Sequence, residues 1–204
     1  MEVQFNINDN GVLENAEFDD TAELSLVYED DFQDIADYLH KTVAVVPDCV
    51  TCIGDRAFYD KRWLTGVIIP DGVVCIGNEA FTDCNYLESV TIPDSVTNIG
   101  VRAFAWCESL TDIVIPCNVT RLEERIFYAC SSLEKILMPD DVSVIGNEAF
   151  AYCGSLKSIT IMNAGADIAQ SAFFGCSKDF TIYAEIGSSA EKYSIENSFK
   201  FESI

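Results

Sequence analysis

The sequence is poor in histidine and in basic residues. His40 is the only histidine, and 12 Lys and Arg stand against 34 Asp and Glu, which gives 204 residues a net charge of −22. With one His, neither a Ser-His-Asp or Cys-His set nor a repeated metal-ligand spacing can be argued. The acidic excess would repel nucleic-acid phosphates and anionic lipid headgroups. We therefore expect a protein that is not an enzyme, has no catalytic residue or cofactor, and binds no nucleic acid.

Long apolar runs are also missing. No stretch approaches the roughly 18 apolar residues of a membrane span, so we expect no membrane insertion. The opening MEVQFNINDN has neither the basic nor the apolar region of a secretion signal, which favours a cytoplasmic chain as written. Proline is scarce as well, with five in the whole chain, and their positions reveal the organisation of the sequence.

The five prolines recur every 23 residues. They are Pro47, Pro70, Pro93, Pro116 and Pro139, and Phe58, Phe81, Phe104, Phe127, Phe150 and Phe173 follow the same period. We call the residues at one position of successive repeats a column. Further columns hold Val, Ile, Leu, Gly and Ala, although Glu123 replaces Gly and Ile126 replaces Ala in the fourth repeat. A repeat of this kind buries its apolar side only against its neighbours, so the units must stack. We predict six stacked repeats over residues 47–184.

Each repeat contains a Leu followed by a V/I-x-I segment, which predicts one short strand per repeat in a parallel stack. The expected strands are residues 67–69, 90–92, 113–115, 136–138, 159–161 and 181–183. Proline after a strand ends the ladder because it has no N–H to donate. A period of 23 residues falls within the range of about 20 to 29 for leucine-rich repeats. The predicted fold class is an α+β repeat solenoid, a right-handed leucine-rich-repeat coil with a short-stranded parallel sheet.

Both flanks of the repeats are expected to cap the exposed ends of the coil. Residues 1–46 hold twelve acidic groups and one Lys, and they predict a strand over residues 3–7 and an amphipathic helix over residues 31–41. Residues 185–204 predict a C-terminal cap, with a short helix over residues 188–195 and an extended segment over residues 199–201. The chain thus divides into an acidic N-terminal cap, the six repeats and a C-terminal cap.

The string IPDSVTNIGVRAFAWCESLTDIVIP, residues 92–116, resembles the repeat of the BspA-like leucine-rich-repeat family, also described from treponemal surface proteins. The C-terminal GSSAEKYSIENSFKFESI resembles the end that often closes such arrays. The resemblance implies a bacterial surface or secreted protein that binds host or bacterial proteins in the manner of an adhesin. The family is typically exported with a signal sequence, and the chain as given differs from that pattern because its opening residues show none.

Nine cysteines divide into two groups. Five stand three residues after each Phe and are interpreted as small buried hydrophobes rather than reactive thiols: Cys84, Cys107, Cys130, Cys153 and Cys176. Among the others, Cys49 and Cys52 form a C-x-x-C, and Cys75 lies one repeat from Cys52. A metal or redox site at these three is a weak alternative, because no second C-x-x-C and no nearby His completes it.

Two surfaces of the repeats remain as candidate binding sites. Alternation along the strands places one set of side chains outward: Ile68, Thr91, Asp112, Val114, Lys135, Leu137, Thr160 and Tyr183. A second, aromatic side flanks the Phe and Cys columns: Tyr59, Trp106, Tyr128, Tyr152 and Phe174. We expect a protein-binding scaffold that uses one of these surfaces. The alternatives are a glycan-binding module, with the aromatics as sugar platforms, and the cysteine site.

Overall fold

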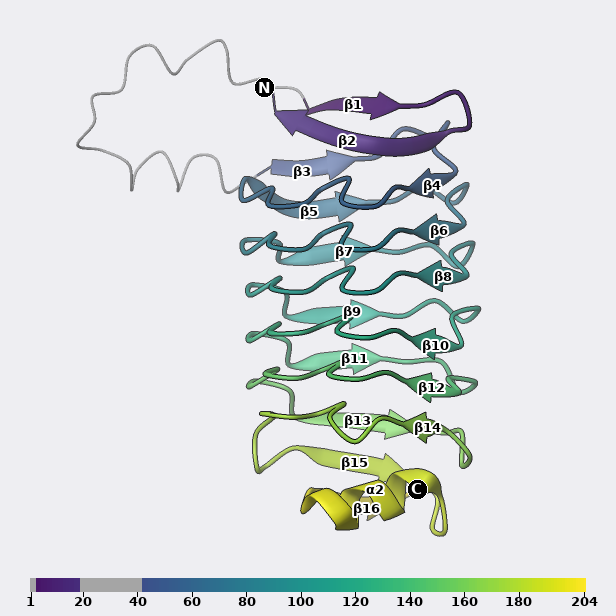
Figure 1. The fold of residues 1–204 in the computed structure, drawn as a ribbon, viewed down its shortest axis with the longest axis vertical. Helices are drawn as coiled ribbons and strands as arrows, with labels where there is room; N and C mark the ends of the chain where they lie inside the picture. Colours follow the sequence, from purple (N-terminus) through teal and green to yellow (C-terminus); the bar gives the residue numbers. More distant parts are fainter. Residues whose placement is uncertain (1–2, 19–41) are drawn as a thin grey trace, which may run out of the picture.

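The repeats stack into one elongated coil in a computed structural model that describes residues 3–18 and 42–204 (Figure 1). One side of the coil carries the strands β3 Thr42–Val45, β5 Leu64–Ile68, β7 Ser89–Thr91, β9 Asp112–Val114, β11 Lys135–Leu137, β13 Ser158–Ile161 and β15 Thr181–Ala184. Within each ladder of this side, neighbours pair in parallel with an offset of one repeat, as Val67 does with Val90. The predicted solenoid fold is confirmed, and β3 adds one rung ahead of the six expected strands.

The strands differ in detail from the predicted ones. Four of the six expected strands end one residue early, before Ile69, Ile92, Ile115 and Met138. Each of these residues precedes a proline, which cannot donate to the ladder. Regular pairing is also interrupted between β7 and β9 and between β11 and β13, so this side holds three ladders in line and not one continuous sheet.

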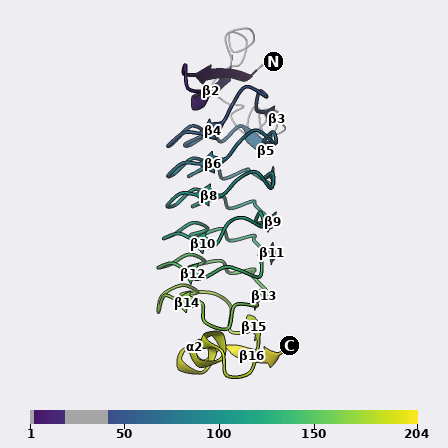
Figure 2. The same ribbon diagram turned by 90° about the vertical axis from the view of Figure 1, so that its right-hand side faces the viewer.

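A second row of strands, which was not predicted, runs along another side of the coil. Its members are β4 Cys52–Ile53, β6 Cys75–Ile76, β8 Asn98–Ile99, β10 Arg121–Leu122, β12 Val144–Ile145 and β14 Asp167–Ile168. Figure 2 shows β10, β12 and β14 along one side and β9, β11 and β13 along the other. Glycine after the Ile column lets these backbones approach closely, because a Cβ on Gly100 would lie 2.6 Å from the backbone nitrogen of Asn78.

The centre of the coil is a stack of phenylalanine rings. The six Phe of the repeat column are fully buried. Successive rings have centroids 4.9–5.6 Å apart and are tilted by no more than 19°. The backbone follows the same spacing, since the N–H of Phe81 donates to the carbonyl of Ala103 in the next repeat at 2.7 Å. The column pattern of the sequence therefore corresponds to a continuous core.

At the N-terminal end, a hairpin covers the first repeat. β1 Val3–Ile7 and β2 Val12–Phe18 pair antiparallel, and β2 continues the second row by pairing in parallel with β4. Leu13 and Ala16 are fully buried, and the ring of Phe5 meets that of Phe58 edge-on at 6.5 Å. The helix expected over residues 31–41, together with His40, lies outside the described residues.

At the C-terminal end, α2 Ser189–Asn197 and β16 Lys200–Ser203 close the stack. The short helix and the extended segment expected in this region are both present, and β16 pairs in parallel with β15. Tyr193 and Phe199 pack their rings edge-on against Phe173, with centroids 5.8 and 6.4 Å away. Within the described part of the chain, no helix is long and apolar enough to cross a membrane.

Candidate functional site

The first candidate surface is the outward side of the odd-numbered strands. We define the strand face as Val45, Ile68, Thr91, Asp112, Val114, Lys135, Leu137, Thr160 and Tyr183. Four aliphatic side chains in its central column are between 46% and 60% exposed, namely Val45, Ile68, Val114 and Leu137. Thr91 and Thr160 in the same column are also exposed, whereas Tyr183 is half-buried. Asp112 and Lys135 are exposed beside the column and face each other in register across β9 and β11.

The second candidate surface is a continuous row of rings. Trp106, Tyr128, Tyr152 and Phe174, which we call the aromatic ladder, meet edge to face with centroids 4.9, 5.4 and 5.5 Å apart. Tyr152 and Phe174 are 47% and 58% exposed, and the other two rings are half-buried. The structure thus brings together four of the five aromatic residues singled out in the sequence.

Tyr59, the fifth, lies apart from the ladder. Thr82 and Ala105 occupy its position in the next two repeats, so no ring connects it to Tyr128. Its own ring is covered by the guanidinium of Arg56, whose Cζ lies 4.3 Å from the ring centroid.

The backbone of the aromatic ladder is unusual at two of its members. Trp106 and Tyr152 have φ of 57° and 62°, and the same position is left-handed in the other repeats as well, at Asp60, Asp83, Ala129 and Gly175. For an L-residue with a side chain this conformation costs about 1–2 kcal/mol. Each edge-to-face ring contact returns about 0.5–1.5 kcal/mol. Because the position is left-handed in all six repeats, this cost belongs to the repeat, and the ring contacts of the ladder are a separate, small stabilisation.

The left-handed position has a signal that the sequence analysis missed. Asp, Asp and Gly stand there in three of the repeats, at Asp60, Asp83 and Gly175, and these residue types tolerate a positive φ. A Cβ added to Gly175 would lie 2.8 Å from Cδ1 of Tyr152. The ring of Tyr152 therefore rests against the Gly175 backbone, in space that a larger residue would occupy.

The three-thiol site considered for Cys49, Cys52 and Cys75 needs correction. Cys52 and Cys75 are Cα partners on β4 and β6 and form a disulfide with their Cα atoms 4.9 Å apart. Cys49 is exposed and has a free thiol. With two of the sulfurs bonded to each other, three thiolates are not available to a metal. Across residues 3–18 and 42–204, no cluster of three or more His, Cys, Asp or Glu could hold a metal ion.

Four of the five repeating cysteines are buried in the core, as interpreted from the sequence, and Cys176 is half-buried against it. Each thiol donates a hydrogen bond to the carbonyl of the Phe one repeat earlier, for example Cys84 to Phe58 at 2.9 Å and Cys130 to Phe104 at 3.1 Å. Burial raises the pKa of the Cys84 and Cys130 thiols to about 12. These thiols are therefore neutral at physiological pH and poor nucleophiles.

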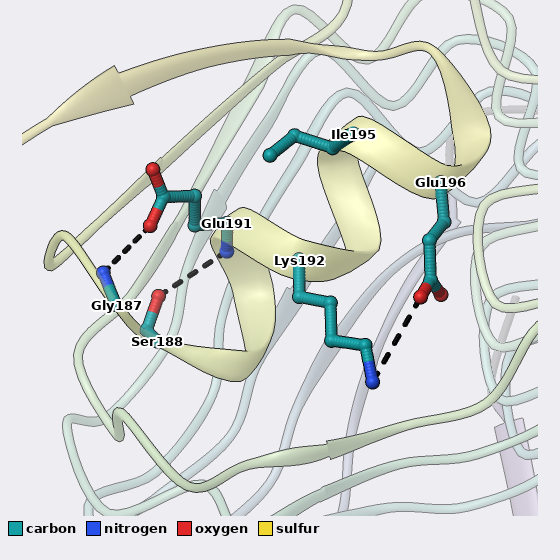
Figure 3. Close-up of a pocket in the computed structure, with 6 residues that line it drawn as sticks. All are labelled: Gly187, Ser188, Glu191, Lys192, Ile195 and Glu196. Carbon is teal, nitrogen blue, oxygen red and sulfur yellow. Dashed lines mark hydrogen bonds and ion pairs between the residues drawn. The ribbon is translucent and has the colours of Figure 1, made fainter.

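A shallow pocket on α2 is explained by the local structure of the helix (Figure 3). Ser188 caps the helix by accepting a hydrogen bond from the N–H of Glu191, and the Glu191 carboxylate accepts one from the N–H of Gly187 at 2.6 Å. Lys192 pairs with Glu196 one helical turn later. The polar groups that line the pocket thus already bind one another, and they form a helix cap without a nucleophile and base in contact.

Comparison with known proteins agrees with this geometry. Residues 51–179 match the family described as BspA type Leucine rich repeat region, in six copies. The chain is similar to the T. pallidum leucine rich repeat protein TpLRR, with 21% identity and a TM-score of 0.64 over 98% of this chain and 95% of that one. A leucine rich cell surface protein from Faecalibacterium prausnitzii A2-165 shows 26% identity and a TM-score of 0.58 over 92% of this chain and 53% of that one.

The pneumococcal vaccine antigen PcpA shares 18% identity and a TM-score of 0.65, over 79% of this chain and 41% of its own length. At this identity the similarity concerns the fold alone, as it does for TpLRR. A search of curated proteins found no match.

Proposed function

Because the chain belongs to the BspA-type leucine-rich-repeat family, a family of repeat scaffolds that generally mediate protein interactions, we propose that it is a non-enzymatic scaffold that binds a protein partner through the strand face. The observation that carries this proposal is the column of exposed aliphatic side chains at Val45, Ile68, Val114 and Leu137. Solenoids commonly bind through extended surfaces of this kind.

The aliphatic residues of the column are not required by the strands themselves. Thr91 and Thr160 occupy the same outward position, so a polar β-branched residue is compatible with the fold there. Fully burying an aliphatic side chain contributes about 1.5–3 kcal/mol, so each half-exposed member offers on the order of 1 kcal/mol to a partner. The strands also hold these side chains in place before binding, which reduces the entropy lost on association.

The similarity to a bacterial cell surface protein suggests where such a partner would be met. The F. prausnitzii relative is described as a cell surface protein, and this chain covers 53% of its length. We extend the proposal accordingly to an adhesin-like role in which the partner is a host or bacterial surface protein.

The test uses threonine, the residue that the chain itself places in this column. A variant with Val45→Thr, Ile68→Thr, Val114→Thr and Leu137→Thr is immobilised beside the unaltered protein, and proteins captured from bacterial and host-cell extracts are quantified by mass spectrometry. We expect specific partners of the unaltered protein to be lost from the variant.

Val74→Thr is the matched control, because Val74 is 50% exposed directly before β6 in the other row of strands, and Thr51 and Thr97 hold the same place in the neighbouring repeats. It should capture the same partners as the unaltered protein. Partners that remain on the fourfold variant, with its unfolding transition intact, would exclude the strand face.

A further inference from the structure

The aromatic ladder forms a second exposed surface, separate from the strand face. We propose that it binds a cationic segment of a partner protein, with Arg or Lys side chains placed against its rings. This inference rests on the proposed function in so far as both treat the chain as a protein-binding scaffold, but it concerns other residues and a defined partner chemistry.

The ladder continues into acidic positions along the coil. Its left-handed backbone position is held by Asp60 and Asp83 in the first two repeats, and by Trp106 in the third. The N–H of Asp83 donates to the carbonyl of Ala105 at 3.0 Å, which places this acid one rung from Trp106. Asp60 is already paired with Arg62 at 2.9 Å, so a segment lying along the coil would meet the Asp83 carboxylate and then the rings at successive rungs, and both attract cations.

One ring of the ladder, Tyr128, and the separate Tyr59 on the same side of the coil already bind guanidinium groups of the protein itself. The Cζ atom of Arg56 lies 4.3 Å from the ring centroid of Tyr59, and that of Arg125 lies 5.5 Å from the centroid of Tyr128. Both distances fall within the range of a cation–π contact. These intramolecular contacts show that rings on this side of the coil have faces that a guanidinium can reach.

The charges near the ladder leave it attractive to a further cation. Arg125, the cation against the ladder, is paired with Glu148 at 2.5 Å and lies 4.0 Å from Glu124. Its positive charge is therefore offset locally, within a chain whose net charge is −22. Electrostatic complementarity thus favours a basic partner over an acidic or neutral one.

The exposed rings leave apolar area available to a partner. Tyr152 and Phe174 stay about half exposed although each makes an edge-to-face contact, and the backbone at Trp106 and Tyr152 adopts a conformation that bulky residues rarely have. Glycine at position 175 leaves the space in which the Tyr152 ring lies.

The test measures binding of a synthetic peptide of four Arg-Ala units by calorimetry at about 0.15 M salt, where long-range attraction is largely screened. The variant Trp106→Ala, Tyr152→Ala and Phe174→Ala keeps every charge and introduces residues that the repeats already hold at these positions, as at Ala105, Ala129 and Ala151. We expect its affinity for the peptide to fall at least about tenfold, and a peptide with Glu in place of Arg not to bind.

Two controls separate the possible causes. Tyr152→Phe keeps the ring and should retain binding, which distinguishes loss of the ring from a local change of fold. The fourfold Thr variant of the strand face should bind the peptide as the unaltered protein does, so failure of the strand-face proposal and failure of this one give different results.

Several outcomes would overturn the inference. They are no binding of the Arg peptide to the unaltered protein, equal binding to the triple Ala variant, and ladder-dependent binding of cellopentaose or chitopentaose without ladder-dependent binding of the peptide. The second result would assign the attraction to net charge alone, and the third would make the ladder a sugar platform.

Discussion

Replacing Gly100 with alanine tests the close contact between successive repeats. A Cβ at this position would lie 2.6 Å from the backbone nitrogen of Asn78 and 2.7 Å from the carbonyl carbon of Gly77. Gly100 has no left-handed backbone, so the effect is steric and not conformational. Relieving the clash must move the backbone at Asn78 or Gly100. This movement would also disturb the hydrogen bond that the N–H of Val101 donates to Oδ1 of Asn78.

Overpacking of this kind costs about 1–3 kcal/mol, and a weakened hydrogen bond adds about 1 kcal/mol. We therefore expect Gly100→Ala to lower the free energy of unfolding by about 2–4 kcal/mol. Glu123 and Ala169 occupy the same position in other repeats, so the stack can accommodate a Cβ and the variant should still fold.

Urea unfolding followed by circular dichroism measures this change. At a slope near 2 kcal/mol per molar urea, the midpoint should fall by about 1–2 M. Gly154→Ala is the control, since its added Cβ would meet no atom within 4 Å and its backbone is not left-handed. Its stability should be unchanged or rise by up to about 1 kcal/mol. Equal midpoints for the two variants would refute the steric explanation.

Three further predictions concern the core and the cysteines. Phe104→Ala, which removes a ring stacked between two others, should cost about 3–5 kcal/mol in urea unfolding, whereas Phe174→Ala at an exposed ring should cost less than about 1 kcal/mol. A thiol reagent at pH 8 should rapidly modify the exposed Cys49 and Cys117 in the folded protein. It should modify seven thiols in the unfolded protein and nine once the unfolded protein is reduced. Nine reactive thiols before reduction would exclude the disulfide. Because burial raises the folded-state pKa of thiols such as Cys84 from 9.0 to about 12, their contribution to stability is complete below pH 9 and is lost as the pH rises toward 12. A thermal midpoint that stays constant between pH 8 and pH 11 would contradict this.

The columns of the sequence predicted the stack well because every repeat buries the same positions. Pro47 and its equivalents set the register, and the Phe and Cys columns could be assigned to the core from spacing alone. The second row of strands was missed because Cys52–Ile53 and its equivalents are only two residues long, too short for any periodic pattern. The sequence placed Cys52 and Cys75 in one column of adjacent repeats. A disulfide also requires that the two residues face each other as Cα partners on neighbouring strands, which the column did not show.

The aromatic side shows a different limit of the sequence. The five residues were recognisable as apolar side chains at positions where the repeat requires none. Their grouping could not be predicted, because the aromatic ladder alternates between two adjacent columns, with Trp106 and Tyr152 in one and Tyr128 and Phe174 in the other. Trp106 and Tyr152 also have a left-handed backbone, which the periodic pattern of the sequence does not reveal.

The fourth repeat departs from the others at the glycine position, where the second row of strands is also interrupted. Glu123 replaces the glycine that lets neighbouring backbones approach, and pairing is interrupted there, between β8 and β10. Phe104 and Phe127 at the same junction have the widest ring spacing in the column, 5.6 Å. Ala169 also replaces this glycine, but with only a methyl group, and β12 and β14 remain paired.

A full side chain at this position therefore loosens the junction where a methyl group does not. The disulfide and the acidic residues of the left-handed position lie before the junction, and most of the aromatic ladder lies after it. Trp106 and Tyr128 are the ladder members on either side, and their rings are in contact at 4.9 Å, the shortest spacing in the ladder. The N–H of Trp106 also donates to the carbonyl of Tyr128 at 2.7 Å. The aromatic ladder thus crosses the junction at which the second row of strands is interrupted, and it presents one surface on both sides of that junction.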